Sequence, residues 1–251
     1  ILKVVDLTVA RPDGSLGLDD VSFEIRSGEI LGVAGVAGSG QKELCEAIAG
    51  LRPVQSGLMI HKGDNIVGLS PKAILEKGIS MSFIPEDRLG MGLVGSMDLT
   101  DNMMLRWYRN GRSPIADRKS PKKLAEDVVD QLEVVTPSIN TPVRRLSGGN
   151  VQKVLVGREI AQQPSVLMTA YAVRGLDINT SYTIYNLLTE QKMQGVAVIY
   201  VGEDLDVLLE LCDRILVLCG GQVSGIVDAR TTTKEEVGLL MTRFKKEAAE
   251  G

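Results

Sequence analysis

The residues best suited to chemistry lie within positions 145–153, where Ser147 is followed by Gly148, Gly149 and Asn150. Ser147 is a favourable N-cap residue, and the two glycines allow a ligand to come close to the backbone. Apolar residues at helical spacing follow, so the stretch predicts a helix whose first N–H groups have no partner within the helix. Such N–H groups, at the positive end of the helix dipole, suit a phosphate. Taken alone, Ser-Gly-Gly is more typical of a capped surface helix.

A second glycine-rich stretch follows residues 30–36, an apolar run that is typical of a buried parallel strand. Gly35 and Gly40 have the spacing of a phosphate-binding loop that joins a strand to a helix. The backbone N–H groups of Gly38, Ser39 and Gly40 could point at phosphates. The alternative is a glycine turn with a purely structural role.

The two positions after this loop depart from the phosphate-binding pattern, which requires lysine and then serine or threonine. They hold Gln41 and Lys42. The lysine contact to the outer phosphates and the hydroxyl that ligates Mg²⁺ are therefore missing. Because a charge-assisted hydrogen bond contributes about 1.5–3 kcal/mol, its loss is expected to weaken nucleotide binding about ten- to a hundredfold. Lys42 could take over the lost charge, but it lies about 100° further round the helix.

The full string from Leu146 to Asn150 resembles the signature motif of ATP-binding cassette (ABC) proteins, and the Gln152-Lys153 ending resembles the subgroup that drives sugar and nucleoside importers. The resemblance implies an α/β protein with the P-loop ABC ATPase fold: a mostly parallel sheet, an N-terminal antiparallel β-subdomain and a helical insertion. It also implies that the signature motif closes over the γ-phosphate of an ATP held by the opposite ATPase domain of a dimer. The Arg-Gly-Leu-Asp stretch that ends at Asp177 resembles the D-loop, so Asp177 is expected to face the same partner nucleotide.

Five positions that carry hydrolytic or nucleotide-sensing residues in most relatives hold other residues here. Ala170 and Tyr171 occupy the slots of the acidic pair, and neither can ligate a metal or accept a proton from water at pH 7. Glu203 stands in the histidine slot of the switch region, and Glu86 replaces the glutamine that senses the γ-phosphate. With Gln41 in the lysine slot, the chain is expected to hold no catalytic residue and no metal.

The pattern resembles the second, degenerate ATPase domain of tandem ATP-binding subunits in sugar and nucleoside importers. The resemblance covers Leu2 to about Met241, so residues 1–251 are interpreted as a single ABC nucleotide-binding domain with a helical subdomain at about 89–163. Because the chain starts at Ile1 without a methionine, it is expected to be a C-terminal fragment of a longer tandem chain. Its own P-loop is expected to bind ATP weakly, with Mg²⁺ only at the partner domain's site.

The same resemblance implies several partners. These are a second ABC ATPase domain upstream in the same polypeptide, transmembrane permease subunits and an extracellular substrate-binding protein, with the chain peripheral on the cytoplasmic face of the cell membrane. A short helix of the permease would dock on an adaptable apolar surface after Glu86. The alternative is that these apolar residues pack the helical subdomain. They are Met91, Leu93, Val94, Met97, Met103, Met104 and Trp107.

Composition argues against some other classes of function. The net charge of −4 argues against a nucleic-acid partner, and no apolar run is long enough to span a membrane. Cys45, Cys212 and Cys219 are odd in number and lie in apolar surroundings, so they are interpreted as reduced core thiols. Two alternatives stay open: a soluble ABC ATPase acting on DNA or ribosomes, which would need coiled-coil or zinc insertions, and a non-catalytic dimerisation module of the same fold.

Periodicity and turn residues predict alternating strands and helices, which indicates a parallel sheet covered on both faces. Thr100, Ser120 and Thr233 are predicted to start helices. The one histidine, His61, is interpreted as a surface residue, and residues 9–11 contain no aromatic side chain to stack on adenine. The expected strands cover residues 4–9, 21–25, 30–36, 80–84, 166–169 and 196–201, with hairpins at 59–66 and 215–227, and the expected helices cover 41–49, 70–78, 100–107, 180–194, 204–211 and the segments after Ser120, Ser147 and Thr233.

The isolated chain is expected to hydrolyse ATP no faster than a control without protein, because no residue at the strand end can hold Mg²⁺ or act as general base. The measurement is phosphate release in the presence of Mg²⁺ and ATP, from a preparation shown to be free of contaminating ATPases. A magnesium-dependent turnover of about 1 s⁻¹, an ordinary rate for an enzyme, would contradict this interpretation.

Overall fold

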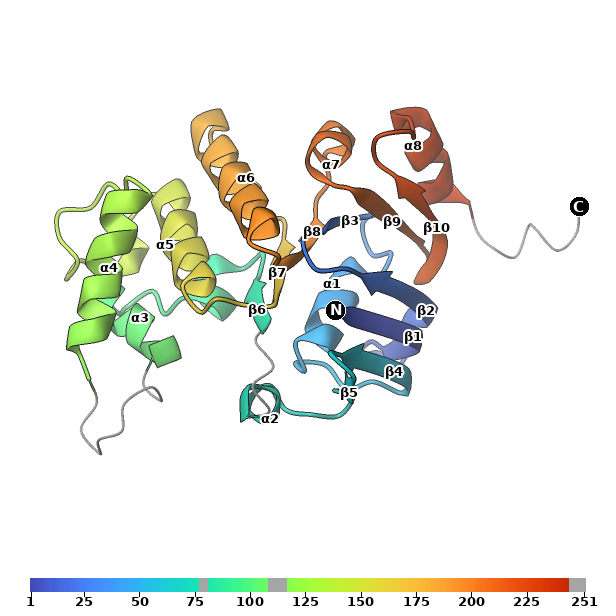
Figure 1. Ribbon diagram of the computed structural model, residues 1–251, viewed down its shortest axis with the longest axis horizontal. Coiled ribbons are helices and arrows are strands. Elements are labelled where there is room, and N and C mark those ends of the chain that lie inside the picture. Colours follow the sequence, from blue (N-terminus) through green and yellow to red (C-terminus); the bar gives the residue numbers. More distant parts are fainter. Residues whose placement is uncertain (77–80, 108–116, 244–251) are drawn as a thin grey trace, which may run out of the picture. The chain divides into compact units, whose positions relative to one another are not determined.

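The computed structural model describes residues 1–76, 81–107 and 117–243 (Figure 1). Two compact units make up the chain. Unit 1 comprises Ile1–Phe83, Ser165–Tyr171 and Leu188–Gly251, and unit 2 comprises Ile84–Pro164 and Ala172–Leu187. The chain therefore leaves unit 1 for unit 2 and returns twice.

Unit 1 contains a four-stranded antiparallel sheet. Its strands are β1 (Leu2–Ala10), β2 (Leu16–Ile25), β4 (Ser56–His61) and β5 (Asp64–Asn65), in the order β2-β1-β4-β5. Val4 pairs with Phe23 on one side and with Met59 on the other, and all three side chains are buried. Alternation of such residues with exposed ones is expected for a sheet that buries one face. The predicted N-terminal antiparallel sheet is confirmed.

A six-stranded sheet has the order β10-β9-β3-β8-β7-β6. Its strands are β3 (Ile30–Ala34), β6 (Met81–Ile84), β7 (Val166–Ala170), β8 (Ala197–Val201), β9 (Arg214–Cys219) and β10 (Gln222–Asp228). β3 pairs in parallel with β8 and β9, β7 pairs in parallel with β8, and β9 and β10 form an antiparallel hairpin. Every residue of β3, β7 and β8 is buried, which agrees with their nearly continuous apolar sequences.

The helices of unit 1 are α1 (Gln41–Ile48), α2 (Pro71–Glu76), α7 (Leu205–Leu211) and α8 (Lys234–Thr242), together with the last residues of α6 (Ile178–Met193). α1 contributes Leu44, Cys45 and Ile48 to the buried core. Thr233 caps α8 as predicted, because its hydroxyl oxygen accepts the N–H of Glu236 at 3.2 Å. The three cysteines are buried and free, also as predicted.

The described part of unit 2 is mainly helical, with η1 (Arg88–Gly92), α3 (Leu99–Trp107), α4 (Lys119–Gln131), η2 (Val143–Arg145), α5 (Gly148–Ile160) and the first residues of α6. α4 approaches α5 at Gly157, where a Cβ would lie 2.8 Å from a methyl group of Val128. The fully buried carboxylate of Glu159 pairs with Arg106 (2.6 Å) and Arg158 (2.9 Å). Burial lowers the pKa of Arg158, and the carboxylate beside it opposes that shift.

Two predicted helix starts are wrong. Asp98 rather than Thr100 caps α3, because Asp98 Oδ1 accepts the N–H of Asp101 at 2.8 Å, and Thr100 is buried in the first turn. α4 begins one residue before Ser120, beside Asp117, which accepts the Ser120 hydroxyl. At the start of α3 an aspartate does what threonine was expected to do, since aspartate caps at least as well, whereas the N-cap residue of α4 is Arg118, which makes no side-chain cap bond.

Other boundaries also differ, and β2 starts at Leu16 rather than at residue 21. The hairpin expected at 59–66 is β4–β5, which starts at Ser56, and its turn lies at Lys62 and Gly63, whose φ angles are 49° and 93°. The predicted end of the short helix at residue 78 and the predicted strand start at residue 80 lie outside the described residues. The order of strands and α-helices agrees with the predicted one.

His61 is buried rather than exposed, which corrects its interpretation as a surface residue. It ends β4 with none of its surface exposed, and its Nε2 lies 3.0 Å from the Ser165 hydroxyl. Nδ1 has no hydrogen-bond partner within the described part of the chain. Burial, with the positive charge of Lys62 nearby, lowers the pKa of His61 from 6.5 to about 4, so the ring is neutral at pH 7. The sequence could not indicate this burial, because Ser165, which His61 contacts, lies 104 residues further along the chain.

The free energy of unfolding is expected to fall as the pH is lowered from 6.5 towards 4. In this window the unfolded chain binds a proton on His61 that the folded chain does not bind, because the folded pKa is about 4. The loss should reach about 2 kcal/mol at pH 4.5. Urea unfolding at pH 7 and pH 4.5 measures it, with His61→Gln as the variant that lacks the titrating group. Equal losses in the two proteins would contradict a buried neutral histidine.

Candidate functional site

The parallel strands bring three predicted site segments to one edge of unit 1. β3 leads into residues 35–40, β7 ends at Ala170 and is followed by Tyr171, and β8 leads towards Glu203. The carboxyl ends of parallel strands share an edge of the sheet. The Tyr171 N–H donates to the Val201 carbonyl oxygen at 2.9 Å, so the ends of β7 and β8 are in contact. The glycine-rich loop, the Ala170-Tyr171 pair and Glu203 therefore lie along one edge.

The loop between β3 and α1 turns through two glycines in the left-handed region, Gly38 (φ 81°) and Gly40 (φ 109°). Gly40 also requires space, because a Cβ there would lie 2.5 Å from the carbonyl oxygen of Gly17. One loop amide is already used within the loop, since the Ser39 N–H donates to the Val36 carbonyl oxygen at 3.1 Å. Fewer amides are then left for a phosphate than the sequence pattern suggested.

Gln41, in the lysine slot, folds its side chain back into the loop. Its Nε2 donates to the carbonyl oxygens of Gly35 (2.8 Å) and Val36 (3.2 Å), and the residue is 4% exposed. The loop is therefore bonded to a neutral amide of the same chain. A nucleotide phosphate at this loop would gain no charge-assisted bond from residue 41.

Lys42 lies on the outside of α1. Its side chain is 69% exposed, and its Nζ lies 3.8 Å from Glu46 Oε1, one turn further along the helix. Arg52 holds the same glutamate at 2.6 Å. The lysine is thus paired away from the helix start, where a phosphate would be bound.

Arg11, which the sequence analysis did not single out, holds the loop from the β1–β2 hairpin. Its Nη2 donates to the Gly38 carbonyl oxygen (2.7 Å), its Nε to Glu43 Oε1 (2.8 Å) and its Nη1 to the Leu16 carbonyl oxygen (3.1 Å). One guanidinium therefore joins the hairpin, the loop and α1. The sequence signal was the missing aromatic residue at 9–11, which showed what had been lost but not what replaced it.

The end of β7 offers no ligand for Mg²⁺. Ala170 is buried, and Tyr171 adopts a left-handed backbone (φ 53°) with a half-buried side chain. Glu203, beyond the end of β8, is exposed. Over residues 1–76, 81–107 and 117–243, no group of three or more His, Cys, Asp or Glu side chains is placed to hold a metal ion.

In unit 2, Ser147 caps α5 as predicted. Its Oγ accepts the backbone N–H of Asn150 (3.4 Å) and the side-chain amide of the same residue (2.9 Å). Asn150 Oδ1 in turn accepts the N–H of Val135 (3.0 Å), which ties the preceding loop to the helix start. Gly148 and Gly149 begin α5, so their N–H groups have no partner within the helix, and Ser147 and Gly148 are exposed. This arrangement of amides suits an anion.

Asp177 caps α6 close to the same helix start. Its Oδ2 accepts the hydroxyl of Thr180 (2.7 Å) and its Oδ1 accepts the N–H of Thr180 (2.9 Å), and these bonds lower the pKa of Asp177. A Cβ on Gly149 would lie 3.1 Å from Thr180 Oγ1. The structure thus brings the signature motif and Asp177 together within unit 2.

Glu86, in the slot of the γ-phosphate-sensing glutamine, forms an ion pair with Arg174, three residues before Asp177. Arg88 is a further residue that the sequence analysis did not single out. Its Nε donates to Gln152 Oε1 on α5 (2.7 Å), and its Nη2 donates to the Arg174 carbonyl oxygen. Three segments far apart in the sequence therefore meet beside the start of α5.

The apolar residues predicted to form an adaptable surface divide between core and surface. Leu93 and Met103 are buried in unit 2, as the packing alternative requires. Five of the seven keep exposed area: Met91, Val94, Met97, Met104 and Trp107. The region thus offers part of the predicted surface and uses the rest in its own core.

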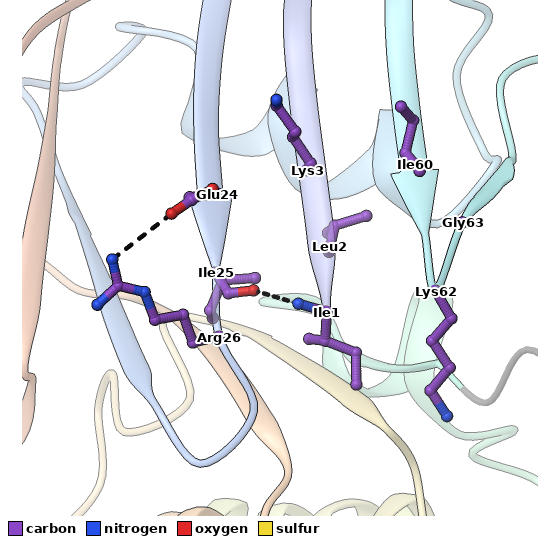
Figure 2. Close-up of a pocket in the computed structure, with 9 residues that line it drawn as sticks. All are labelled: Ile1, Leu2, Lys3, Glu24, Ile25, Arg26, Ile60, Lys62 and Gly63. Atoms are coloured by element: carbon purple, nitrogen blue, oxygen red, sulfur yellow. Dashed lines mark hydrogen bonds and ion pairs between the residues drawn. The ribbon is translucent and has the colours of Figure 1, made fainter.

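Two surface pockets of unit 1 lie elsewhere. One, of about 270 Å³, is formed at the ends of β1, β2 and β4 (Figure 2). In this pocket the Ile1 nitrogen donates to the Ile25 carbonyl oxygen (2.8 Å), and Arg26 pairs with Glu24. The other is lined by residues 26–29, 213–214, 228 and 230. Neither pocket is lined by a predicted site residue.

The sequence model of the ABC transporter family matches residues 18–169, which is more than half of the chain. The chain belongs to the ABC transporter family. A solved dimeric ATP-binding cassette in a post-hydrolysis state, bound to ADP and Pi, superposes with a TM-score of 0.80 at 22% identity and covers 92% of this chain and 100% of that one. A nucleotide-free ATP-binding cassette from an ABC transporter gives 0.76 at 20% identity, over 96% and 94%. The predicted P-loop ABC ATPase fold is confirmed.

Sequence relatives are longer than this ABC chain. The guanosine import ATP-binding protein NupO of Bacillus subtilis is 37% identical over 96% of this chain and 48% of its own length. The galactose/methyl galactoside import ATP-binding protein MglA of Escherichia coli is 34% identical over 94% and 46%. The chain spans about half the length of the curated relatives it matches. None of the helices in its described part is both long and apolar enough to cross a membrane.

Gln41→Lys is expected to strengthen ATP binding about tenfold, because it returns the charge that the loop lacks. Lys42→Ala is the matched change at the neighbouring position and should alter the affinity less than twofold, since Lys42 is exposed and paired with Glu46. Calorimetric titration of the chain with ATP measures both. A loss beyond tenfold in Lys42→Ala would contradict the placement of that side chain away from the phosphates.

Proposed function

We propose that this chain is an ATP-binding domain of an ABC importer for sugars or nucleosides, in which its own ATP site is degenerate and its signature motif completes the site of a partner ATPase domain. The contrast between two helix starts carries the proposal. The loop before α1 is bonded to its own Gln41 and to Arg11, whereas the start of α5 keeps its Ser147 cap, two glycines and exposed backbone.

The chemistry offered at the start of α5 is electrostatic. Ser147 Oγ accepts both bonds from Asn150, which leaves the hydroxyl hydrogen to donate to a phosphate oxygen. With the N–H groups of Gly148 and Gly149 it would contact the γ-phosphate held by the partner's P-loop, where exclusion of water strengthens each bond. The partner supplies Mg²⁺ ligands and the base that activates water.

The relatives support a tandem arrangement, because import ATP-binding proteins twice as long match this chain over half their length. In the proposal, residues 1–251 are one ABC nucleotide-binding domain with a helical subdomain at about 89–163, and a second ATPase domain lies upstream in the same polypeptide. Permease subunits and an extracellular substrate-binding protein complete the importer, and this chain lies on the cytoplasmic face of the membrane. ATP is the cofactor, with Mg²⁺ at the partner's site.

The segment after Glu86 is the proposed contact with a permease helix. Leu89 (40% exposed), Met91 (50%) and Val94 (38%) leave apolar area in solvent on and beside η1. Flexible methionine and aliphatic side chains adapt to an apolar helix face. The ion pairs of the buried Glu159 with Arg106 and Arg158 would keep the helices beneath this surface rigid.

Gly148→Asp is expected to abolish ATP-driven uptake by the assembled transporter while the domain stays folded. The side chain has room, because the nearest atom to a Cβ there is Arg88 Nη1 at 3.4 Å. A carboxylate at this position repels the γ-phosphate, and loss of such stabilisation lowers turnover about a hundredfold or more. Uptake into proteoliposomes and the melting temperature are the two measurements.

Two variants control for this result. Gly238→Asp makes the same change in α8, where a Cβ meets nothing within 4 Å, and should leave uptake unchanged. Tyr171→Phe, at the strand end that has lost its acids, should also have little effect. If uptake survives Gly148→Asp and fails with Tyr171→Phe, the working and idle sites have been assigned in reverse.

A further inference from the structure

One guanidinium in unit 2 spans the two segments that the proposed function places before the partner's nucleotide. Arg88 Nε donates to Oε1 of Gln152, in the second turn of α5, at 2.7 Å. Its Nη2 donates to the carbonyl oxygen of Arg174, in the D-loop segment. Its Nη1 lies beside the signature motif, 3.4 Å from where a Cβ on Gly148 would be.

The turn that carries Arg88 is fixed to α5 at its other end. The carbonyl oxygen of Gly92 accepts a bond from Arg158 Nη2 at 2.7 Å. Gly92 also packs so closely on α5 that a Cβ there would lie 2.8 Å from Leu155 Cδ2. Both ends of η1 thus contact α5, through Arg88 and through Gly92. The position of Arg88 relative to the signature helix is therefore fixed by these contacts.

The residue that receives Arg88 on α5 is a buried amide. Gln152 has no exposed surface, and its Nε2 finds no hydrogen-bond partner in the part of the chain that the structure describes. An unsatisfied buried donor lowers stability, so an apolar side chain of similar size would serve the core better. The contribution of Gln152 therefore lies in its Oε1, which holds Arg88.

Residues 173–176 of the D-loop segment form a turn, and Arg88 binds within it. The Leu176 N–H donates to the Val173 carbonyl oxygen at 3.1 Å, and Arg88 binds the carbonyl of Arg174 between them. The Arg174 side chain also pairs with Glu86, but both partners are about half exposed, and such pairs hold weakly in water. The Arg88 bond instead goes to the main chain of this segment, from a side chain that is itself half-buried.

The geometry points to Arg88 as a positioning residue that fixes the D-loop segment to the signature helix, so that Asp177 and the Gly148 and Gly149 amides meet the partner's nucleotide as one surface. The expected effect on the partner's nucleotide rests on the proposed function, whereas the positioning of the D-loop segment rests on contacts within unit 2. Arg88 touches no nucleotide in this role. By restricting the conformations of the D-loop segment in advance, Arg88 lowers the entropy cost of closing the dimer. It therefore stabilises the closed dimer and does not affect the capture of ATP.

Hydrogen exchange on the chain tests the mechanism. Arg88→Ala should speed exchange of the Leu176 amide at least about tenfold, while amides within α4 keep their rates. Arg118→Ala is the matched control, because it removes an exposed ion pair with Asp101 (2.6 Å) in the same unit, and it should leave Leu176 exchange unchanged. An unchanged Leu176 rate in Arg88→Ala would overturn the inference.

ATP hydrolysis by the assembled transporter tests the consequence. Arg88→Ala should lower kcat about tenfold and change KM for ATP less than twofold, because the partner's P-loop captures the nucleotide. Arg88→Lys replaces the two nitrogens that bond Gln152 and Arg174 with one ammonium and loses the planar fork, so most of the loss is expected to remain. Full rescue by lysine, or an effect on KM alone, would refute the positioning role, since either would mean that charge and not the bridge matters.

Gly148→Asp in the same assay separates this inference from the proposed function. Should hydrolysis persist in Gly148→Asp, the proposed function fails, and the exchange rates of Leu176 still decide whether Arg88 fixes the turn. Should Gly148→Asp abolish hydrolysis while Arg88→Ala keeps the full kcat, the proposed function stands and the positioning role is refuted.

Discussion

The parallel pairing of β3 with β8 and of β8 with β7 determines where unit 1 can hold a ligand. Each crossover must return to the same end of the sheet, so the loops that follow the strands gather at one edge. In this chain that edge carries an amide, a methyl group and a phenol, from Gln41, Ala170 and Tyr171. The fold of the family forms although these three positions hold uncharged side chains, so the fold does not depend on charges there.

The candidate site in unit 2 is built from different chemical groups. The start of α5 offers main-chain amides, a serine cap and the space left by two glycines, none of which titrates near pH 7. A site of this kind is lost when a side chain is added, whereas the strand-end site in unit 1 is lost when a functional group is exchanged. The two kinds of site can therefore be lost independently of each other within one chain.

Features set by neighbouring residues could be predicted from the sequence. The order of strands and helices, the glycine-rich loop and the caps at Ser147 and Thr233 each follow from a pattern a few residues long. The cap of α3 was misassigned because Asp98 and Thr100 lie close together and both residue types cap well.

Contacts between distant residues could not be predicted. Arg11 and Glu43 are 32 residues apart, Arg88 and Arg174 are 86 apart, and His61 and Ser165 are 104 apart. No periodicity or spacing links such pairs, because the fold alone brings them together. The first two pairs lie beside motifs that the sequence did reveal, the glycine-rich loop and the start of α5.

The loop before α1 is hydrogen-bonded to Gln41 and Arg11 of the same chain, and this affects how the domain responds to the ATP concentration. A ligand stabilises a fold only as far as the folded state binds it better than the unfolded state does. Gln41 and Arg11 already occupy the carbonyl groups of the loop, so the loop keeps its shape without a nucleotide. Under the proposed function, any response to the ATP concentration would then originate in the partner domain, and the pair would have one sensor where a symmetric dimer has two.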